Sequence, residues 1–579
     1  MEQKAIQDLK HKISQRLHFI YKNTGADPSQ LTEKTIELIS RYADKIDQSE
    51  QNWSEKDTLL ITYGDSITKS NEKGLQTLKR FSKNHFDGII KNIHILPFFP
   101  YSSDDGFSVI DYFQVREDLG SWSNVKELNK DFDIAADLVI NHISSQSEWF
   151  QNFLKGKDPG KDFFITEDPE KDISAVVRPR SSPLLTPFET AEGKKYVWTT
   201  FSEDQIDLNF KNPEVFLTML EALLYYLSSG IRIIRMDAIA FLWKEPGTSC
   251  LHLPQTHEIV KLYRDVFDFL GPQYILLTET NVPHKENLSY FGEGDEAHMI
   301  YQFSLPPLLL FSFYSENGHF LNDWGESLPN PPEGSTYLNF TASHDGIGVR
   351  PLEGIVPEKQ KQELFSAIRN HGGEISTKAN SDGSTSPYEM NITYLDALKA
   401  TKYSDLKHQT ERFISSQLLM AAMKGIPAFY IHSLLGTTND YEGYEKTGRA
   451  RSLNRKQWDE TEIIQRLKEE SQNSEIFNRL KDGLKIRKQQ PAFNPEAKQK
   501  WLKLDDDLIA FSRSGESQEI ISITNVTSRR KGISVQSQLP VKELFSDDKL
   551  SVGYSEITIE PFATYWFSGH PDKFHISTV

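Results

Sequence analysis

The stretch IRIIRMD, residues 231–237, has the composition of a buried β-strand and ends in an aspartate. Two other runs of this kind, YILLTET (274–280) and TYLNFTASHD (336–345), carry an acidic residue at or near their ends. Because the strands of a parallel barrel end on the same face, three carboxylates are expected to converge there: Asp237, Glu279 and Asp345. Two carboxylates about 5 Å apart break a glycosidic bond with retention of configuration, and a third can hold the sugar hydroxyls. The three runs therefore predict an enzyme that acts on a sugar.

Five further runs rich in Ile, Leu, Val and aromatic residues repeat this pattern, at 59–65, 92–99, 135–142, 298–304 and 427–435. Amphipathic stretches of helix length, such as PEVFLTMLEALLYYL and HEIVKLYRDVFDFL, lie between the runs. Nearly continuous apolar strands that alternate with helices are typical of a parallel sheet covered on both sides. Eight such units predict an α/β fold, the (β/α)8 TIM barrel, whose active site lies at the carboxyl ends of the strands.

Two intervals between the predicted strands are too long for simple loops, and the two ends of the chain differ from its middle. The first 55 residues have the periodicity of amphipathic helices, and the last 85 or so have short alternating runs typical of an antiparallel sheet. The expected division is a helical N-terminal extension at 1–55, the catalytic barrel at 56–142, 206–348 and 401–494, an inserted domain after the third strand at 143–205, an inserted lid after the seventh strand at 349–400, and a C-terminal β domain at 495–579.

The composition excludes several classes of protein. The 579 residues include 65 Lys plus Arg against 82 Asp plus Glu, a formal charge of −17, which argues against nucleic acid or anionic membrane as a partner. A single cysteine, Cys250, leaves no intrachain disulfide and no multi-cysteine metal site, and no metal or cofactor is expected. The start is polar and no apolar run approaches bilayer length, which predicts a cytoplasmic enzyme.

From residue 56 onward the chain resembles the α-amylase superfamily, glycoside hydrolase family 13. The resemblance rests on signature segments that occur in the family's order: GFSVIDY (106–112), DLVINH (137–142), QIDLN (205–209), IRIIRMDAI (231–239), YILLTET (274–280) and SHD (343–345). The resemblance implies that Asp237 is the nucleophile that forms a glucosyl-enzyme ester and that Glu279 is first a general acid and then a base. Asp345 would grip the glucose 2- and 3-hydroxyls and stabilise the charged transition state.

The same resemblance implies a set of side chains around the glucose unit. Arg235, two residues before Asp237 on the same face of its strand, would keep that carboxylate ionised by opposing its charge. The other residues that match the pocket of the family, or lie beside the acids, are Asp65, His94, His142, Gln205, His344 and Arg451.

A narrower resemblance points to the sucrose phosphorylase branch of this family. It is carried by HILPFFPYSSDDGFSVIDY (94–112), RPR (178–180), WKEPGTSC (243–250), YQFSLPPLLL (301–310) and SHDGIGV (343–349). Members of this branch transfer glucose from an α-glucoside to inorganic phosphate and give α-glucose 1-phosphate, so the implied function is a retaining phosphorylase that works by double displacement. The alternative is an α-glucosidase or transglucosidase that uses water or another acceptor. A silent sugar-binding protein is disfavoured, because all three carboxylates are present.

Phosphate requires donors with the paired geometry of a guanidinium. The segment RPR supplies Arg178 and Arg180 for it, and Tyr388 is a further candidate donor. The competing interpretation of each arginine is a surface ion pair within an acidic loop.

On the acceptor side, ETNVPHKEN (279–287) and PYEMN (387–391) look more like branch members that act on glucosylglycerate or glucosylglycerol than like those that cleave sucrose. These segments supply Asn281 and Glu389 as acceptor-binding candidates. Glycerate would need a cation for its carboxylate, whereas Glu389 would repel it and could bond a glycerol hydroxyl. The expected order is therefore 2-O-α-glucosylglycerol, then glucosylglycerate, then sucrose, an order that Arg178, Arg180 or Lys285 could reverse.

Overall fold

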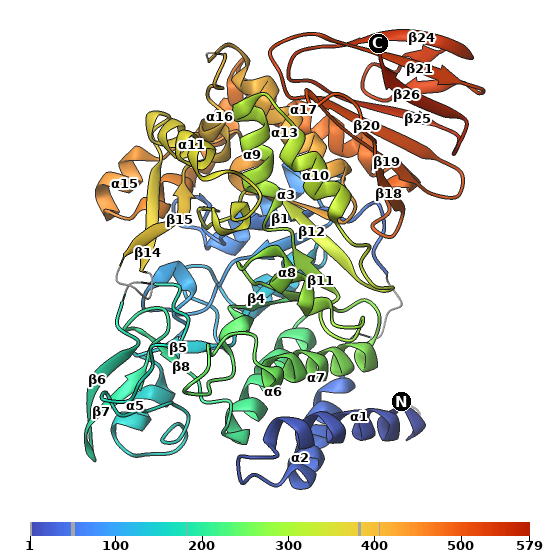
Figure 1. Ribbon diagram of the computed structural model, residues 1–579. Coiled ribbons are helices and arrows are strands. Elements are labelled where there is room, and N and C mark those ends of the chain that lie inside the picture. Colours follow the sequence, from blue (N-terminus) through green and yellow to red (C-terminus); the bar gives the residue numbers. More distant parts are fainter. Residues whose placement is uncertain (1–2, 48–51, 181, 380–383, 405) are drawn as a thin grey trace.

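The computed structural model describes residues 3–47, 52–180, 182–379, 384–404 and 406–579. These residues form a closed barrel of eight parallel strands (Figure 1). In chain order the strands are β1(Leu59–Thr62), β3(Asn92–Ile95), β4(Asp133–Val139), β9(Ile231–Asp237), β10(Ile275–Thr278), β11(Met299–Tyr301), β12(Thr336–Phe340) and β16(Ile426–Tyr430). Each of these strands falls within or overlaps one of the eight predicted runs, so the predicted barrel is confirmed.

Helices surround the barrel, and most of them pair an apolar face with a polar one. Helix α6(Pro213–Ser228) begins with proline in its first turn, and the Asn212 side chain accepts a hydrogen bond from the backbone N–H of Glu214, which caps the helix. The other helices of eight or more residues between the barrel strands or directly after the last one are α3(Gly74–His85), α4(Trp122–Asn129), α7(Pro254–Leu270), α9(Leu305–Ser315), α10(His319–Ser327), α11(Glu358–Asn370), α13(Gln409–Ala422), α16(Glu460–Lys468) and α17(Gln472–Arg487).

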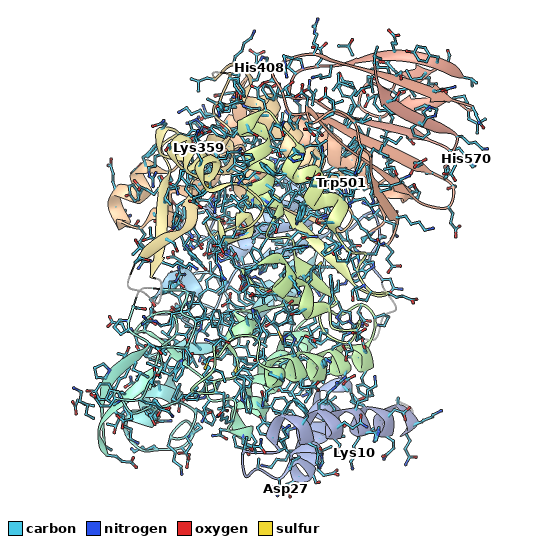
Figure 2. The ribbon with its side chains drawn as sticks, in the orientation of Figure 1. Lys10, Asp27, Lys359, His408, Trp501 and His570 are labelled. Atoms are coloured by element: carbon cyan, nitrogen blue, oxygen red, sulfur yellow. The ribbon has the colours of Figure 1, made fainter. Side chains whose placement is uncertain are left out.

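The chain begins with two helices, α1(Gln3–Tyr21) and α2(Pro28–Ala43), which lie beneath α6 and α7 at the base of the molecule (Figure 1). The Asp27 side chain caps the start of α2 by accepting from the backbone N–H groups of Ser29 and Gln30 (Figure 2). The Tyr21 hydroxyl donates a 3.0 Å hydrogen bond to the backbone oxygen of Phe210, next to α6, and fixes α1 on the barrel.

Two inserts lie on the same side of the barrel in Figure 1. The insert after β4 contains β5(His142–Ser144), α5(Glu148–Leu154), the hairpin of β6(Leu185–Thr190) with β7(Gly193–Trp198), and β8(Gln205–Asp207). The insert after β12 contains a three-stranded sheet in the order β13(Ile347–Gly348), β15(Thr385–Asn391) and β14(Glu374–Ala379). Both inserts therefore approach the carboxyl ends of the barrel strands, as the predicted fold requires.

The C-terminal domain consists of antiparallel strands in two sheets, which confirms that part of the predicted architecture. One sheet has the order β18-β19-β20-β25-β22-β23 and the other β24-β21-β26, formed by β18(Lys498–Trp501), β19(Leu508–Ser514), β20(Glu519–Asn525), β21(Lys531–Ser537), β22(Val541–Glu543), β23(Lys549–Leu550), β24(Gly553–Ile559), β25(Thr564–Gly569) and β26(Phe574–Thr578). Trp501 of β18 packs on α10 (Figure 2), where a Cβ at Gly325 would lie 2.0 Å from the indole ring. Only glycine leaves room for this close approach.

No helix in the described part of the chain combines the length and the apolar character needed to cross a bilayer.

Candidate active site

Arg235, near the carboxyl end of β9, brings three acidic side chains together. Its Nη1 lies 2.5 Å from an Asp137 carboxylate oxygen and 2.7 Å from one of Asp237, and its Nη2 lies 3.9 Å from Glu279. Arg235 is only 3% exposed. Because opposite charges attract strongly away from water, this arginine fixes the positions of the acids at the mouth of the barrel.

The environment of Glu279 favours the protonated form of its carboxyl up to near neutral pH. Burial, reinforced by the charges of Asp237 and Asp345, raises its pKa to about 7 in spite of the opposing Arg235. The backbone N–H of Ala238 donates a 3.1 Å hydrogen bond to the Glu279 carboxyl and fixes its orientation. Burial also raises the pKa of Asp237, but the hydrogen-bonded Arg235 opposes that shift and favours the ionised form. The Glu279 carboxyl, whose proton is favoured, thus lies beside the Asp237 carboxylate, whose ionised form Arg235 favours.

Asp345 is the third predicted acid, and cations surround it. Arg451 Nη1 lies 2.7 Å and Arg455 Nη2 3.9 Å from Asp345 Oδ1. Burial works to raise the pKa of Asp345, but these guanidinium groups outweigh it and hold the pKa well below its usual range. His344 lies 3.6 Å from the other carboxylate oxygen, and burial lowers the His344 pKa to about 3, so this imidazole is neutral at physiological pH. Asp345 therefore stays negatively charged.

The residues expected around the glucose unit lie at the same end of the barrel. His94 Nε2 is 2.7 Å from Asp137 Oδ2, and Gln205 Nε2 is 3.1 Å from His142 Nε2. Apart from Asp65 and Arg451, which are partly exposed, all of these side chains are buried, and Asp65 pairs with Arg116 at 2.5 Å. The structure thus brings the predicted glucose-pocket residues together around the three acids; they are Asp65, His94, His142, Gln205, Arg235, His344 and Arg451.

A cavity of about 70 Å³ opens beside Glu279. Among the residues that line it, three are cationic, Arg178, Arg350 and Lys378, and Glu279 alone is acidic. The lining also includes Asn281 and Tyr388, so three of the five predicted phosphate or acceptor residues meet here. The first insert supplies Arg178 and the second supplies Arg350, Lys378 and Tyr388. The cavity therefore has the charge needed to receive an anion next to the proton donor.

Two further predicted residues of the acceptor region lie around this cavity. The Arg180 guanidinium lies over the Tyr388 ring, 5.8 Å from its centroid, and helps to hold that phenol. Glu389 is 2% exposed and forms a bidentate ion pair with Arg451, with hydrogen bonds of 2.7 and 3.2 Å. Neighbouring residues of a strand point to opposite faces, so Tyr388 faces the cavity while Glu389 faces Arg451. The Glu389 charge is thus partly compensated by an arginine that it shares with Asp345, which weakens the expected repulsion of an acceptor carboxylate.

The sequence interpretation overlooked two of the three cavity cations, Arg350 and Lys378. Arg350 directly follows the segment SHDGIGV, which had been singled out for other reasons. Lys378 lies on β14, paired in register with Ser386 of the strand that carries Tyr388. The available sequence signal for Arg350 and Lys378 was therefore their position next to recognised segments. Neither residue belongs to a motif of its own.

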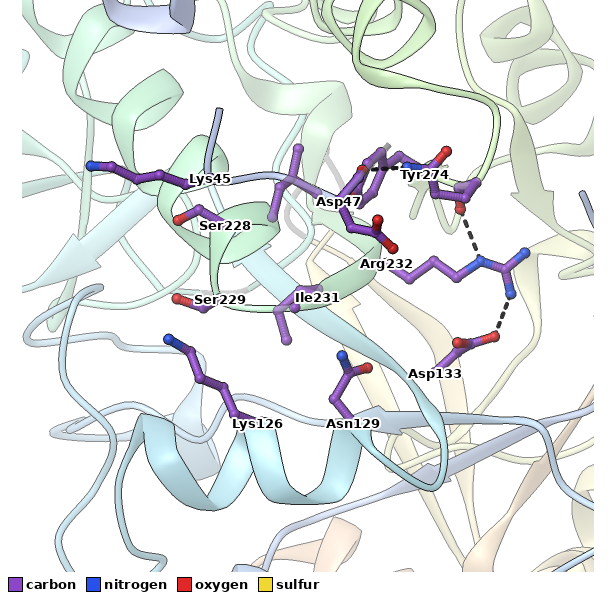
Figure 3. A pocket seen from close by; sticks show the side chains of 13 residues that line it. Lys45, Asp47, Lys126, Asn129, Asp133, Ser228, Ser229, Ile231, Arg232 and Tyr274 are labelled. Carbon is purple, nitrogen blue, oxygen red and sulfur yellow. Dashed lines mark hydrogen bonds and ion pairs between the residues drawn. The ribbon is translucent and has the colours of Figure 1, made fainter. Parts of the chain in front are cut away.

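A second cavity, of about 270 Å³, lies at the opposite end of the barrel, near the amino ends of β4 and β9 (Figure 3). Arg232 lines it and pairs there with Asp133 at 2.7 Å. The three predicted acids are all at the other end of the strands, so this cavity does not adjoin them. Among the residues that the structure describes, no three His, Cys, Asp or Glu side chains gather as ligands of a metal ion would.

Comparisons with known proteins agree with this geometry. Residues 87–324 match the model of the α-amylase catalytic domain. The chain is 40% identical to the glucosylglycerate phosphorylase of Escherichia coli K12 over 96% of this chain and 100% of that protein. It is 43% identical to the glucosylglycerate phosphorylase of Allomeiothermus silvanus (91% of this chain, 94% of that protein) and 28% identical to the glucosylglycerol phosphorylase of Marinobacter adhaerens (75% and 88%).

Among solved structures, the chain is similar to the sucrose 6F-phosphate phosphorylase of Thermoanaerobacter thermosaccharolyticum. The TM-score is 0.71 at 26% identity, and the match covers 81% of this chain and 94% of that one.

Proposed function

Since the chain belongs to the α-amylase family and to the glycoside phosphorylases within it, we propose that it transfers the glucosyl group of glucosylglycerate to inorganic phosphate. The products are α-glucose 1-phosphate and glycerate. The observation that carries this proposal is the cavity beside Glu279, where Arg178, Arg350 and Lys378 converge. Both the leaving glycerate and the incoming phosphate are anions, and each needs cations at this position.

In the first half-reaction, an Asp237 carboxylate oxygen attacks the anomeric carbon while Glu279 gives its proton to the glycosidic oxygen. The bond to glycerate breaks, and a β-glucosyl ester of Asp237 forms. The raised pKa of Glu279, about 7, supports its role as the donor, because about half of these groups still carry the proton at neutral pH. Arg235 supports the role of Asp237, because it favours the ionised nucleophile.

In the second half-reaction, a phosphate oxygen attacks the same carbon from the side that glycerate has left. The Glu279 carboxylate takes the proton of the attacking phosphate hydroxyl, and the ester bond to Asp237 breaks. Two inversions give net retention. Arg178 and Tyr388 line the cavity and are placed to hold phosphate in this step.

Asp345 holds the glucose 2- and 3-hydroxyls and stabilises the positive charge that develops on the ring in both transition states. The cations around it support this role, because they keep its carboxylate ionised. The buried side chains of His94, His142 and Gln205 contribute hydrogen bonds to the remaining hydroxyls of the glucose unit.

The choice of glycerate over glycerol reverses the order expected from the sequence. Glucosylglycerol ranked first because Glu389 would repel a carboxylate, but Arg451 pairs with that side chain and weakens the repulsion. A glycerol unit would leave Arg350 and Lys378 without an anion whenever the α-glucoside is bound, and uncompensated cations in a cavity are unfavourable. The identity of 40–43% to glucosylglycerate phosphorylases, against 28% to a glucosylglycerol phosphorylase, supports the same choice.

The test is to measure release of α-glucose 1-phosphate from glucosylglycerate, glucosylglycerol and sucrose, with and without phosphate. We expect kcat/KM to be highest for glucosylglycerate and sugar phosphate to form only with phosphate. Equal release of free glucose with and without phosphate would identify an α-glucosidase instead. A higher kcat/KM for glucosylglycerol would restore the order expected from the sequence.

A further inference from the structure

We propose that Arg350 and Lys378 form a carboxylate subsite that recognises the acid group of the acceptor, separate from the phosphate-binding Arg178. This assignment rests on the proposed function and names the residues that would set its specificity. Both cations come from the second insert, Arg350 just after β13 and Lys378 on β14, and both line the cavity beside Glu279.

The two cations lack the partners that most half-buried charges have. Neither side chain forms an ion pair with a carboxylate of the described residues. The Arg350 Nε is buried and has no hydrogen-bond partner within the described ranges. An unpaired buried donor is costly unless a ligand satisfies it. Because neither side chain has an acidic partner among the described residues, the positive charge of both is available to an anion in the cavity that they line.

The two charges also act on each other. Burial, together with the nearby Arg350, lowers the pKa of Lys378, and only the exposed Glu353 opposes this shift. Two cations side by side repel one another, and the repulsion is relieved when a negative group lies between them. A carboxylate has two oxygens, and one can be shared with the guanidinium while the other meets the ammonium.

The position beside Glu279 fits the connectivity of the substrate. In 2-O-α-glucosylglycerate the carboxylate carbon is only two bonds from the glycosidic oxygen that Glu279 protonates. A cation that binds this carboxylate must therefore lie in the same cavity as Glu279, as Arg350 and Lys378 do. In glucosylglycerol the corresponding carbon carries an uncharged hydroxyl, so these cations distinguish the two substrates.

Asn281 supplies a complementary contact for the other end of the acceptor. Its Oδ1 is buried without a hydrogen-bond partner in the described structure, and it lies two residues after Glu279. The side chain is held close to the backbone of the second insert, since a Cβ at Gly348 would lie 3.0 Å from that oxygen. The amide is thus placed to bond the free hydroxymethyl group, which glycerate and glycerol share, while the cations bind the group in which they differ.

The first experiment compares substrates in Arg350→Met and Lys378→Met. With saturating phosphate, we expect the ratio of kcat/KM for glucosylglycerate to that for glucosylglycerol to fall about 10- to 100-fold in each variant, because a charged hydrogen bond is lost. Activity on glucosylglycerol reports that the variants are folded. Lys378→Arg should keep most of the ratio. Lys361→Met removes a lysine that pairs with Glu358 away from the cavity, and it should leave the ratio unchanged.

Arg178→Met separates the two anion sites. It should raise the KM for phosphate with either glucoside and leave the ratio between the glucosides nearly constant. If Arg350→Met and Lys378→Met lower kcat/KM for both glucosides equally, the carboxylate subsite is wrong, whereas phosphorolysis of glucosylglycerate by the unchanged enzyme still stands.

Calorimetric titration with glycerate tests the subsite without catalysis. We expect glycerate to bind the unchanged enzyme and to bind both methionine variants at least 10-fold more weakly. Binding of this kind without phosphorolysis of glucosylglycerate would overturn the proposed function and support the subsite. Equal affinity of all three proteins for glycerate would overturn the subsite.

Discussion

The two ends of strand β9 each carry a buried arginine, and the two arginines do different things. Arg232, at the amino end, lies 2.7 Å from Asp133 and 3.3 Å from Asp57, and its Nε donates to the backbone oxygen of Gln273 (Figure 3). Arg235, near the carboxyl end, is shared by three acids instead: Asp137, Asp237 and Glu279. One strand of seven residues therefore connects two ion-pair networks of different composition.

The difference between them lies in the balance of charge. Of the described residues at the base, two cations, Arg232 and Lys91, face two acids, Asp57 and Asp133. At the mouth, three acids share Arg235, and burial together with the negative charges of Asp237 and Asp345 raises the pKa of Glu279. A balanced network holds strands together, whereas an unbalanced one keeps a proton ready for transfer. The following predictions test that contrast.

Asp237→Asn should have the largest effect. The amide cannot form the glucosyl ester, so we expect kcat for phosphorolysis to fall about 10⁴-fold or more. Initial rates of α-glucose 1-phosphate formation measure this loss, and thermal unfolding provides the control for folding. If the variant kept more than a few per cent of the activity, Asp237 would not be the nucleophile.

Glu279→Gln should lower kcat about 10²- to 10⁴-fold, since the proton donor is lost. In the unchanged enzyme, kcat/KM should fall as pH rises through about 7, because Glu279 then loses its proton. Measured pH profiles that stay flat between pH 6 and 8.5 would contradict this role.

Although Glu279→Gln should lower kcat, it should raise the stability of the fold. The folded-state pKa of Glu279, about 7, lies above its ordinary value of 4.5. The proton therefore stabilises the fold fully below about pH 4.5, and this contribution, about 3 kcal/mol, is lost as pH rises through 7. Glutamine does not titrate, so the Tm of Glu279→Gln should rise relative to the unchanged enzyme between pH 5 and 8.

Arg232→Met tests the base of the barrel. Its removal leaves Asp57 and Asp133 with less compensation in a buried place, which should lower the free energy of unfolding by about 3–5 kcal/mol. The kcat of the folded variant should equal that of the unchanged enzyme, because the acids at the mouth keep their partners. A fall in kcat without a fall in Tm would show that Arg232 serves catalysis and not the stability of the barrel.

Gly348→Ala should have the smallest effect. The new methyl group would lie 3.0 Å from Asn281 Oδ1, so the amide must move by a few tenths of an ångström. We expect a loss of a few-fold in kcat/KM for glucosylglycerate and glucosylglycerol alike, since both share the hydroxymethyl group that Asn281 would bind. An unchanged kcat/KM for both would remove Asn281 from the acceptor site.

The barrel was predictable because its signal is local. A run such as IRIIRMD is buried along its whole length, and its composition alone indicates a strand. The carboxyl end of each strand is then fixed by chain direction, which is why the approximate location of Asp237, Glu279 and Asp345 followed from the sequence.

The acceptor side was not predictable to the same degree, because its chemistry depends on contacts between distant loops. Glu389 is paired with Arg451, which lies after the last barrel strand, and no spacing rule connects the two. Arg350 and Lys378 likewise meet only once the second insert has folded against the barrel. The reaction class, a phosphorylase, was therefore predicted correctly from the sequence. The predicted order of substrates depended on the charge of Glu389, whose ion pair with Arg451 the sequence does not reveal.

Arg451 bridges Asp345 and Glu389, and this bridge constrains how the enzyme can evolve. A mutation of Glu389 that alters the acceptor side also changes how strongly Arg451 attracts Asp345, so it disturbs the recognition of glucose at the same time. Arg350 and Lys378 have no such tie to an acid of the described residues, so under the proposed subsite their exchange would change the acceptor and leave the glucose site intact. Divergence in acceptor use within this branch is thus expected to concentrate at these two unpaired positions.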